Sequence, residues 1–423
     1  FSDTPPITVV MAKPHSKLWL VVGGVILCAL VIIAIVLAVL LSNQDQGILP
    51  AHVLLSQVPL IDGHNDLAYN MKLILKNQIN EFDFNCYLQH NPKWNCSSCM
   101  TDIKRLNDGQ VGAQFWSAYV PCSTQYHNAV EETLEQIDVI KRFVHKYPKQ
   151  LELVTTANGI WESFARKRIA SLIGVEGGHS IDSRLAVLRQ MYELGVRYLT
   201  LTHTCNTPWK SNLKAENNGL SNFGKAVVYE MNRLGMMVDL SHVSHKTMHD
   251  VLNITMAPVI FSHSSAYAIC PHHRNVHDDR ENGGIVMVNF FPEFVKFNSS
   301  KPVTIEDVAE HINYIRLVTG VDHVGIGGDY DGVDKAPVGL EDVSKYPKLF
   351  ELLSTPQSGK PHWSTTDLKK LAGLNLLRVF KQVEKVRDSM SNQVPYENLL
   401  PEKPDSQYKS VPMWADCGAG NAY

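Results

Sequence analysis

Eight short apolar runs recur along this sequence from about residue 56, and longer amphipathic stretches separate several of them. The runs are VPLIDG, VGAQFWSAYV, IASLIGVEG, RYLTLTH, MMVDLSH, APVIFSH, GGIVMVNF and HVGIGGDY. Near-continuous apolar strands separated by helices are typical of a parallel sheet. Eight such units over about 330 residues predict a (β/α)8 barrel of the TIM type. The alternative is an open doubly wound sheet, whose first strand is usually followed by a glycine-rich phosphate loop, and LIDGHND is not such a loop.

Polar side chains end six of the eight runs. They are His64 and Asp66 after the first, Glu176 after the third, His203 after the fourth, His242 after the fifth, His263 after the sixth and Asp329 after the eighth. All strands of a barrel end at one face, which is where such barrels carry out catalysis. His64 and Asp66 are two residues apart and therefore leave a strand on the same side. The sequence predicts one site built from all of these residues.

The residue types of this predicted site point to two metal ions. Imidazole and carboxylate are common zinc ligands, and a lone catalytic zinc takes about three protein ligands. At least five candidates converge here, and Glu176 can bridge two ions with its two oxygens. Two such ions share a water and generate hydroxide at neutral pH. A carboxylated lysine is another known bridge, but the nearest lysine after the fourth run is Lys210, and no G-x-S-x-G motif supports a serine nucleophile.

Residues 18–41 carry no charge, and as a helix they would exceed the roughly 30 Å hydrocarbon core of a bilayer. Lys13 and Lys17 precede them, so the positive-inside rule places the N-terminus in the cytosol. We predict a cytoplasmic segment (1–17), a transmembrane signal anchor (18–41), a stalk (42–55), a catalytic domain (56–390) and a C-terminal tail (391–423). A cleaved signal peptide is the alternative, but the run exceeds the usual length and lacks a clear cleavage site. No hydrophobic tail follows at the C-terminus, so a GPI anchor is not expected.

Other features fit a plasma-membrane protein with its catalytic domain outside the cell. Asn95, Asn253 and Asn298 begin glycosylation acceptor triplets. Of the eight cysteines only Cys28 lies in the apolar segment, and the others would meet an oxidising space that favours disulfides. Three of them, in NCYLQHNPKWNCSSC, predict a local disulfide rather than a zinc site, because a second pair is missing. The net charge of -3 and the lack of a long basic stripe argue against nucleic acid as a partner.

Ser364 to Met390 reads as a helix that packs on the barrel. STTD resembles an N-terminal capping box with Asp367 in place of the usual glutamate. Apolar residues follow at helical spacing.

The motifs IDGHND, GVEGGHSI, YLTLTHTCNTPW, DLSHVS, FSHSSAYA, RNV and GIGGDYDGV, in this order, resemble the membrane dipeptidase family, also called renal dipeptidase. The resemblance runs from about Pro59 to Phe380. It implies a (β/α)8 barrel that holds two zinc ions and hydrolyses dipeptides with a free C-terminal carboxylate.

The resemblance also implies a role for each matching residue. His64 and Asp66 would bind the first zinc, Glu176 would bridge both ions, and His242 and His263 would bind the second. His203 would contact the substrate and steady the oxyanion, Arg274 would clamp the terminal carboxylate, and Asp329 would shuttle a proton to the leaving amine. Asp331 is the neighbouring candidate for the last role. A guanidinium fork suits a carboxylate geometrically.

The family pattern further implies a disulfide between Cys122 and Cys205. Cys270 would be free or paired with the NCSSC segment, and Cys417 lies roughly where the family links two subunits, which suggests a homodimer. Vertebrate members carry a C-terminal lipid anchor, whereas an N-terminal anchor is expected here.

Three functions remain open at this stage. The chain is a surface zinc dipeptidase, a catalytically inactive receptor-like ectodomain, or a barrel hydrolase of another amide such as a β-lactam. Every expected ligand position is filled, which favours an enzyme.

Overall fold

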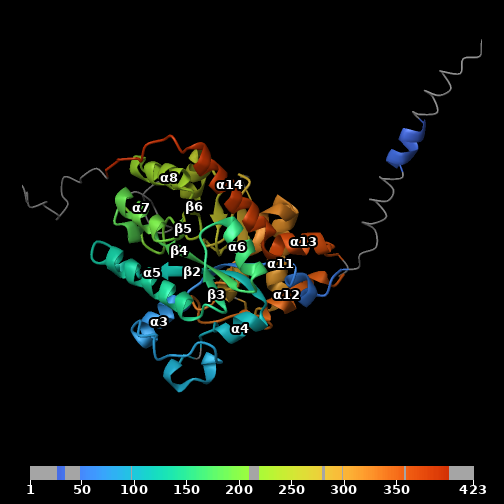
Figure 1. The fold of residues 1–423 in the computed structure, drawn as a ribbon, viewed down its shortest axis with the longest axis horizontal. Helices are drawn as coiled ribbons and strands as arrows, with labels where there is room; N and C mark the ends of the chain where they lie inside the picture. The colour runs from blue at the N-terminus through green and yellow to red at the C-terminus, as the bar shows by residue number, and fades with distance from the viewer. Residues whose placement is uncertain are drawn as a thin grey trace, which may run out of the picture. The chain divides into compact units, whose positions relative to one another are not determined.

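The computed structural model describes residues 26–33, 48–96, 98–208, 219–278, 282–297, 299–356 and 359–399. The chain divides between Leu49 and Pro50 into two units. In the first unit residues 26–33 form a helix (Figure 1), and the remainder of the predicted membrane segment lies outside the described residues. Within the ranges given above, no helix has both the length and the apolar character needed to cross a bilayer.

The second unit contains a closed barrel of eight parallel strands. Around the ring each strand pairs with its neighbours in the order β2-β1-β9-β8-β7-β6-β5-β4, and β4 pairs with β2 to close it. The strands are β1 (Leu60–Asn65), β2 (Val111–Tyr119), β4 (Ile169–Glu176), β5 (Val196–Thr200), β6 (Met237–Asp239), β7 (Ile260–Phe261), β8 (Ile285–Val288) and β9 (Val324–Ile326). Each coincides with one of the eight predicted runs. The barrel prediction is confirmed, and the open sheet is excluded by the seven-residue register from Ala113↔Ala170 to Tyr119↔Glu176.

A ninth strand lies outside the ring and was not predicted. β3 (Leu151–Leu153) pairs only with the start of β4. It has three residues, and its sequence LEL is too short to give an alternating pattern. This strand does not contribute to the site.

The barrel interior is filled by side chains that come from alternate positions of the strands. Phe115 of β2 packs on Tyr198 of β5 with ring centroids 5.1 Å apart, and Met237, Ile260 and Met287 belong to the same core. Burying each side chain of this size stabilises the fold by about 1.5–3 kcal/mol. The strands are buried on both faces, which is why their runs lack polar alternation.

Helices surround the ring of strands (Figure 1). The helices of the second unit are α2 (Ala51–Leu55), α3 (Leu67–Leu75), α4 (Ile103–Asp108), α5 (Ala129–Lys146), α6 (Ala157–Ala165), α7 (Leu185–Glu193), α8 (Asn222–Leu234), α9 (His245–Ile254), α10 (Pro292–Val295), α11 (Ile305–Thr319), α12 (Tyr346–Ser354), α13 (Thr365–Lys369) and α14 (Asn375–Ser389). Two of them, α5 and α7, coincide with the amphipathic sequences AVEETLEQIDVIKRFVHKY and SRLAVLRQMYELG, which lie between apolar runs. The described part of the stalk includes α2, whose Leu54 and Leu55 are buried in this compact unit.

The predicted C-terminal helix is present with one irregularity. Its capping box is confirmed, because Ser364 and Asp367 exchange hydrogen bonds with each other's backbone N–H groups. A π-helical segment, Lys370–Leu374, then joins α13 to α14. A Cβ at Gly373 would lie 2.2 Å from the carbonyl oxygen of Pro59, so only glycine allows the helix to lie this close to β1.

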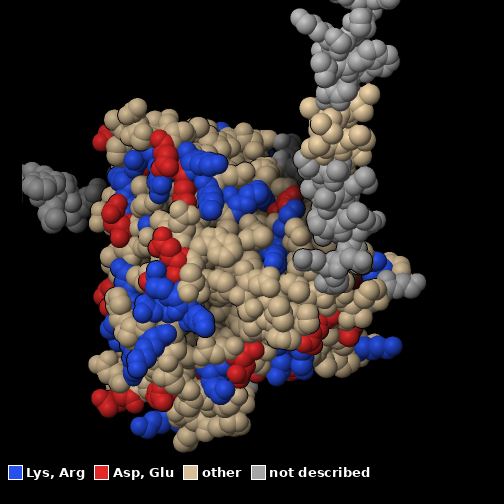
Figure 2. Space-filling view, turned by 45° about the vertical axis from the view of Figure 1, so that its right-hand side comes forward, with Lys and Arg blue, Asp and Glu red and all other residues tan. Residues whose placement is uncertain are grey.

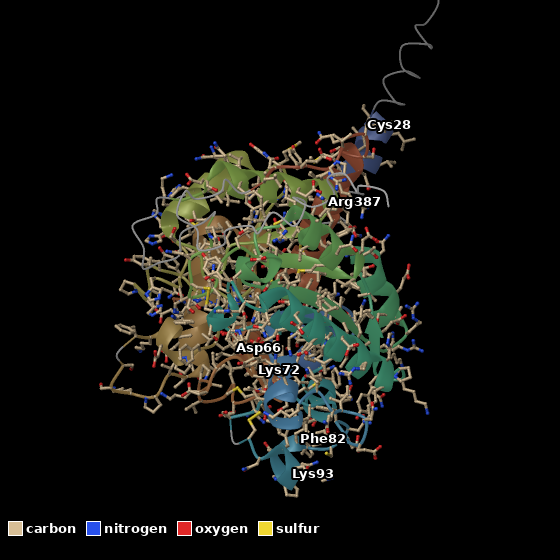
Figure 3. The ribbon with its side chains drawn as sticks, turned by 90° about the vertical axis from the view of Figure 1, so that its left-hand side faces the viewer. Cys28, Asp66, Lys72, Phe82, Lys93 and Arg387 are labelled. Carbon is tan, nitrogen blue, oxygen red and sulfur yellow. A yellow bond between two sulfur atoms is a disulfide. The ribbon has the colours of Figure 1, made fainter. Side chains whose placement is uncertain are left out.

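A long excursion between α3 and α4 projects from the barrel and carries Phe82 and Lys93 (Figure 3). It is held by its own aromatic cluster, in which Trp94 is fully buried and its ring centroid lies 5.2 Å from that of Phe82. A disulfide between Cys96 and Cys99 closes a short loop within it.

On the face shown in Figure 2, basic and acidic side chains are interspersed.

Candidate metal centre

The polar residues predicted at the strand ends lie together at the carboxyl end of the barrel. His64 belongs to β1, Asp66 is the N-cap residue of α3, and Glu176 is the last residue of β4. His242 and His263 follow β6 and β7 by three and two residues. The side chains of all five are at most 11% exposed, so the group is withdrawn from bulk water.

Glu176 divides these residues into two sets. Its Oε2 faces His64, whose Nε2 lies 3.4 Å away and is itself 3.1 Å from Asp66 Oδ2. Its Oε1 faces the other set, with His242 Nε2 at 3.0 Å and His263 Nε2 at 3.4 Å. Both sets have the residue types and spacing that could hold a metal ion, and Glu176 belongs to both. A carboxylate placed in this way can bridge two ions.

The nitrogen atoms that face the centre are kept available by neighbours on the far side of each ring. His64 Nδ1 lies 2.9 Å from the hydroxyl of Tyr198, and His263 Nδ1 lies 2.8 Å from Ser262 Oγ. Ser262 Oγ in turn donates to Asp239 Oδ2 at 2.6 Å. When a metal takes the place of a proton on Nε2, Nδ1 stays protonated and hydrogen bonded, which is the arrangement that orients metal-bound histidines.

Two unpaired buried atoms indicate that the centre fits a metal. His64 Nε2 and Asp66 Oδ1 are buried without a hydrogen bond. Leaving a buried polar atom unpaired costs about 1–3 kcal/mol, and more if it is charged. His242 Nε2 and His263 Nε2 also lie only 2.9 Å apart. A metal ion beside His64 and Asp66, and another beside His242 and His263, would accept these lone pairs, so the donor set fits zinc.

The charges of the centre lead to the same conclusion. Burial opposes the charged form of His64, but Tyr198, Glu176 and Asp66 outweigh it and raise the pKa of His64 well above its usual range. Burial, with the positive charge of Arg274 as a further cause, holds the pKa of His242 well below its usual range. Glu176 is charged in spite of its burial, because the histidines around it lower its pKa well below the usual value. The buried carboxylates therefore need a cation beside them.

The loops that follow β6 and β9 each contain a residue with a strained backbone conformation. His242 and Asp329 have φ values of 65° and 62°, in the left-handed region that side chains avoid at a cost of roughly 1–2 kcal/mol. A Cβ at Gly332 would lie 2.3 Å from Asp66 Oδ2 and 2.7 Å from Asp329 Oδ1. The absence of a side chain at Gly332 lets these two carboxylates approach the centre.

Asp329 and Asp331 were not separable by sequence spacing, but the structure separates them. Asp329 Oδ1 lies 3.9 Å from His64 Nε2, and its Oδ2 accepts a hydrogen bond from Asn289. Burial, together with Asp66 and Glu176, raises the pKa of Asp329 to about 7. Asp331 points away from the centre and accepts hydrogen bonds from Asn70 and from the backbone of Met100.

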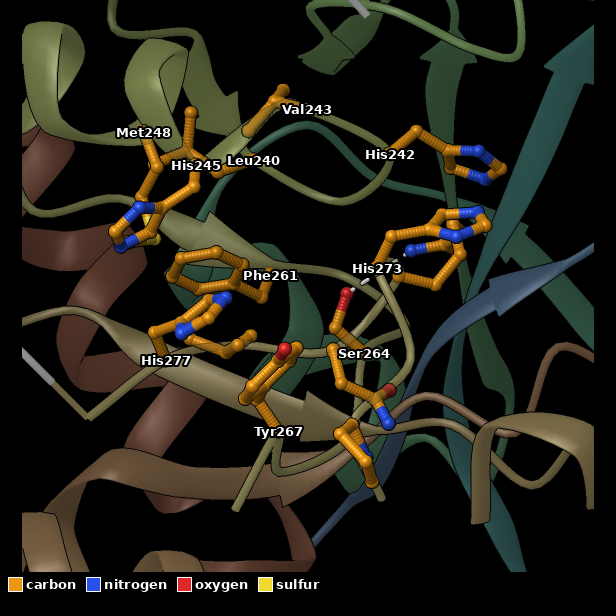
Figure 4. Close-up of a pocket in the computed structure, with 14 residues that line it drawn as sticks. Leu240, His242, Val243, His245, Met248, Phe261, Ser264, Tyr267, His273 and His277 are labelled. Carbon is orange, nitrogen blue, oxygen red and sulfur yellow. Dashed lines mark hydrogen bonds between the residues drawn. The ribbon is translucent and has the colours of Figure 1, made fainter. Parts of the chain in front are cut away.

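His203 and Arg274 flank the second set. His203 Nε2 lies 4.0 Å from Glu176 Oε1, and its ring packs on Tyr119 with centroids 4.8 Å apart. Arg274 is buried and donates to Ser264 Oγ and to the carbonyl oxygen of His263, while its Nε is unpaired. His242 and Arg274 both line a cavity of about 330 Å³ (Figure 4). A positive side chain and one residue of the centre therefore border a space that a small ligand can enter.

A disulfide between Cys122 and Cys205 joins the loop after β2 to the loop that carries His203. Cys270 is buried and forms no disulfide, so the predicted alternative of pairing with NCSSC is wrong. Asn95 and Asn253 are exposed. Asn298, Lys210 and Cys417 lie outside the described residues.

Sequence reasoning missed the residues that orient the ligands, Tyr198, Asp239 and Ser262. Tyr198 reads as one more apolar strand residue, and its role depends on a contact with His64 across the barrel. Asp239 did carry a signal, because a carboxylate inside the apolar run MMVDLSH needs a buried partner.

Residues 49–394 match the family described as membrane dipeptidase (peptidase family M19). Dipeptidase 3 of Mus musculus is 45% identical over 368 residues, which are 84% of this chain and 71% of the relative. Dipeptidase 3 of Homo sapiens is 46% identical over 363 residues, 83% of this chain and 70% of the relative. The crystal structure of dipeptidase AC, a metallopeptidase of family M19, superposes with a TM-score of 0.68 at 25% identity and covers 77% of this chain and 98% of that chain.

Proposed function

The chain belongs to the membrane dipeptidase family of metallopeptidases, peptidase family M19, and from this premise we propose that it hydrolyses dipeptides with the aid of two zinc ions. The observation that carries the proposal is the position of Glu176. Its two carboxylate oxygens face separate ligand sets, His64 with Asp66 and His242 with His263. A single ion would leave one of these sets without a partner.

The residues that would hold the ions follow from this division. His64 and Asp66 serve one ion, His242 and His263 serve the other, and Glu176 serves both. When bound, two zinc ions supply a water of lowered pKa and polarise the peptide carbonyl.

Two further residues would act on the substrate. His203 is held neutral by burial, which lowers its pKa, so its Nε2–H can donate a hydrogen bond to the oxygen on which negative charge develops. Asp329, whose pKa is raised to about 7, can hold a proton at Oδ1 and release it to the leaving amine. Asn289 fixes the orientation of Asp329 by donating to its other oxygen.

Arg274 would select substrates with a free C-terminal carboxylate. Its guanidinium is buried beside the cavity, and the described part of the chain gives it no direct ion pair. A buried cation without an anion is costly, so a substrate carboxylate would supply the missing partner.

The location and assembly are part of the same proposal. Residues 18–41 would anchor the chain in the plasma membrane with the catalytic unit outside the cell. Glycosylation at Asn95 and Asn253 would then be accessible, since both are exposed. A homodimer, with Cys417 as a link between subunits, is proposed on the family resemblance alone.

The test is turnover of a dipeptide panel by the purified catalytic unit, before and after zinc is removed and restored. We expect hydrolysis that is lost with the metal and regained with zinc, and that is lost in Asp329→Asn but retained in the matched variant Asp331→Asn if that variant folds. A fully zinc-loaded, folded protein without activity toward any dipeptide would support the receptor-like alternative. Turnover of a β-lactam with no turnover of dipeptides would support the other hydrolase.

A further inference from the structure

A second group of histidines lies apart from the Glu176 centre, on helix α9. His245 and His249 are one helical turn apart, and their Nε2 atoms are 3.0 Å from each other. Their rings meet edge to face, with centroids 4.4 Å apart. His245 is exposed and His249 is half-buried, so solutes can reach the pair. Side chains at i and i+4 of a helix lie on one face, which explains the contact.

The separation of the two nitrogens matches a shared ion. Zinc–nitrogen bonds are about 2.0–2.1 Å, so two nitrogens 3.0 Å apart subtend roughly 90–95° at a common ion. A tetrahedral site would need about 3.3–3.4 Å, a change of a few tenths of an ångström that side-chain rotation supplies. Imidazole suits zinc, copper and nickel ions.

Neighbouring rings hold His245 in place. His277 packs on His245 with centroids 4.3 Å apart, and Tyr267 stacks on the other side of His277 at 3.8 Å. This column of rings forms part of the wall of the 330 Å³ cavity, which His242 and Arg274 also line. In Figure 4 His242 lies apart from His245 and His277. An ion on His245 would therefore lie at the wall of a cavity that also borders His242 of the Glu176 centre.

We propose that His245 and His249 form a separate binding site for a divalent transition-metal ion, zinc in the first instance, and that an ion there hinders entry of substrate into the cavity. Water would complete the coordination of the ion. The binding part stands independently of the proposed dipeptidase activity, whereas the effect on substrate entry rests on it.

The binding test uses the full chain, already loaded with zinc and dialysed, and measures uptake of additional zinc by calorimetry near pH 7.5. The unaltered protein should bind one more ion than His249→Gln. Loss of a group that merely orients a ligand costs about 10- to 100-fold in metal affinity, so loss of a ligand should cost at least about tenfold. His249 does not line the cavity, and the matched control His145→Gln changes an exposed histidine of α5 and should bind as the unaltered protein does.

Copper provides a second measurement that does not depend on activity. One added Cu²⁺ should show coupling to two imidazole nitrogens in its EPR spectrum, and this signal should disappear in His249→Gln. Equal uptake of zinc by all three proteins, or no two-nitrogen copper signal, would mean that the pair does not bind an ion. Neither of these negative results would contradict the proposed two-zinc centre.

The substrate test compares KM for a dipeptide at low and at added zinc. Added zinc should raise KM severalfold in the unaltered protein and in His145→Gln, with little change in kcat, and should leave KM unchanged in His249→Gln. An ion that binds at His249 without raising KM would overturn the effect on entry. If no protein hydrolyses a dipeptide under any condition, the proposed function fails while the binding result stands.

Discussion

The Oε1 atom of Glu176 lies 3.0 Å from Nε2 of His242, on the opposite side of the carboxylate from the oxygen that faces His64. One side chain at the end of β4 therefore joins residues from β1 to residues that follow β6 and β7. A parallel barrel makes this arrangement accessible because its strands converge at one face.

Replacing Glu176 with glutamine should remove metal from the centre while preserving the fold. The neutral amide keeps the size of the side chain but is a poor zinc ligand, and it cannot balance the charge of two ions. Metal analysis of Glu176→Gln should show clearly fewer than two zinc ions per chain, and activity should fall by at least about a hundredfold. A variant with two zinc ions and normal turnover would disprove the bridging role.

Ser262→Ala should weaken zinc binding without removing a ligand. Ser262 Oγ connects His263 Nδ1 to Asp239, so its loss frees the ring to rotate and to change tautomer. Loss of such an orienting partner typically costs about 10- to 100-fold in metal affinity. Competition with a chelator measures this directly. Ser171→Ala is the control, because Ser171 is also buried on a barrel strand but its Oγ makes no hydrogen bond, and equal zinc affinity of the two variants would contradict the relay.

The barrel, and the meeting of polar side chains at its carboxyl end, could be predicted from sequence because both depend on local patterns. Strand runs are mostly apolar, and His64, Glu176 and His263 lie at or just after the ends of their runs, so counting positions was sufficient to place these three residues together. The parts that could not be predicted depend on contacts between distant elements. Tyr198 touches His64 across 134 positions of sequence, and Asp329 differs from Asp331 only in where the loop directs each carboxylate.

The same limit applies to the irregular parts of the fold. β3 is too short to show a pattern. The π-helical segment before α14 contains Gly373, which lies against Pro59, the residue just before β1. The sequence of the helix itself, with its capping box and apolar spacing, gives no sign of the extra residue in that turn.

Glu230 should contribute to stability only above acidic pH. Its side chain is buried in α8; burial opposes its charge, but hydrogen bonds from Arg233 and Arg189 outweigh this and lower its pKa below the ordinary 4.5. A carboxyl group whose folded pKa is depressed stabilises the fold above its unfolded pKa, and loses that contribution as pH falls through the folded value. Glu230→Gln should therefore lower the free energy of unfolding by roughly 1–3 kcal/mol at pH 7, with a smaller difference below pH 4.

Urea unfolding of the zinc-loaded protein at several pH values measures this effect. Glu135→Gln is the control, since Glu135 is half-exposed and lies 3.7 Å from Lys72, a surface pair worth less than about 1 kcal/mol. A difference for Glu230→Gln that is the same at pH 7 and at pH 3 would contradict the assignment to charge.

The N-terminal segment should act as the membrane anchor. Residues 18–41 are free of charge and follow Lys13 and Lys17, which predicts a helix inserted with its N-terminus in the cytosol. Expression in secretory cells should give a product that shifts on glycosidase treatment, remains with membranes after phosphatidylinositol-specific phospholipase, and is secreted when residues 1–41 are replaced by a cleavable signal peptide. Release of the unaltered chain by the phospholipase would refute the anchor.

Arg274 should make the enzyme selective for dipeptides with a free C-terminus. Its guanidinium is fixed by hydrogen bonds to Ser264 and to the backbone of His263, stacks at 5.0 Å over Phe294, and borders the cavity. Loss of one side of a buried charged pair costs roughly 2–5 kcal/mol, or about 30- to several thousand-fold. A dipeptide amide should therefore be a much poorer substrate than the free acid.

Arg274→Ala should slow hydrolysis of the free acid only. Arg274→Lys should recover part of the preference, because an ammonium keeps the charge but loses the fork-shaped pair of donors. The measurement is kcat/KM for both substrates with all three proteins, and equal cleavage of acid and amide by the unaltered protein would show that Arg274 is not the carboxylate clamp.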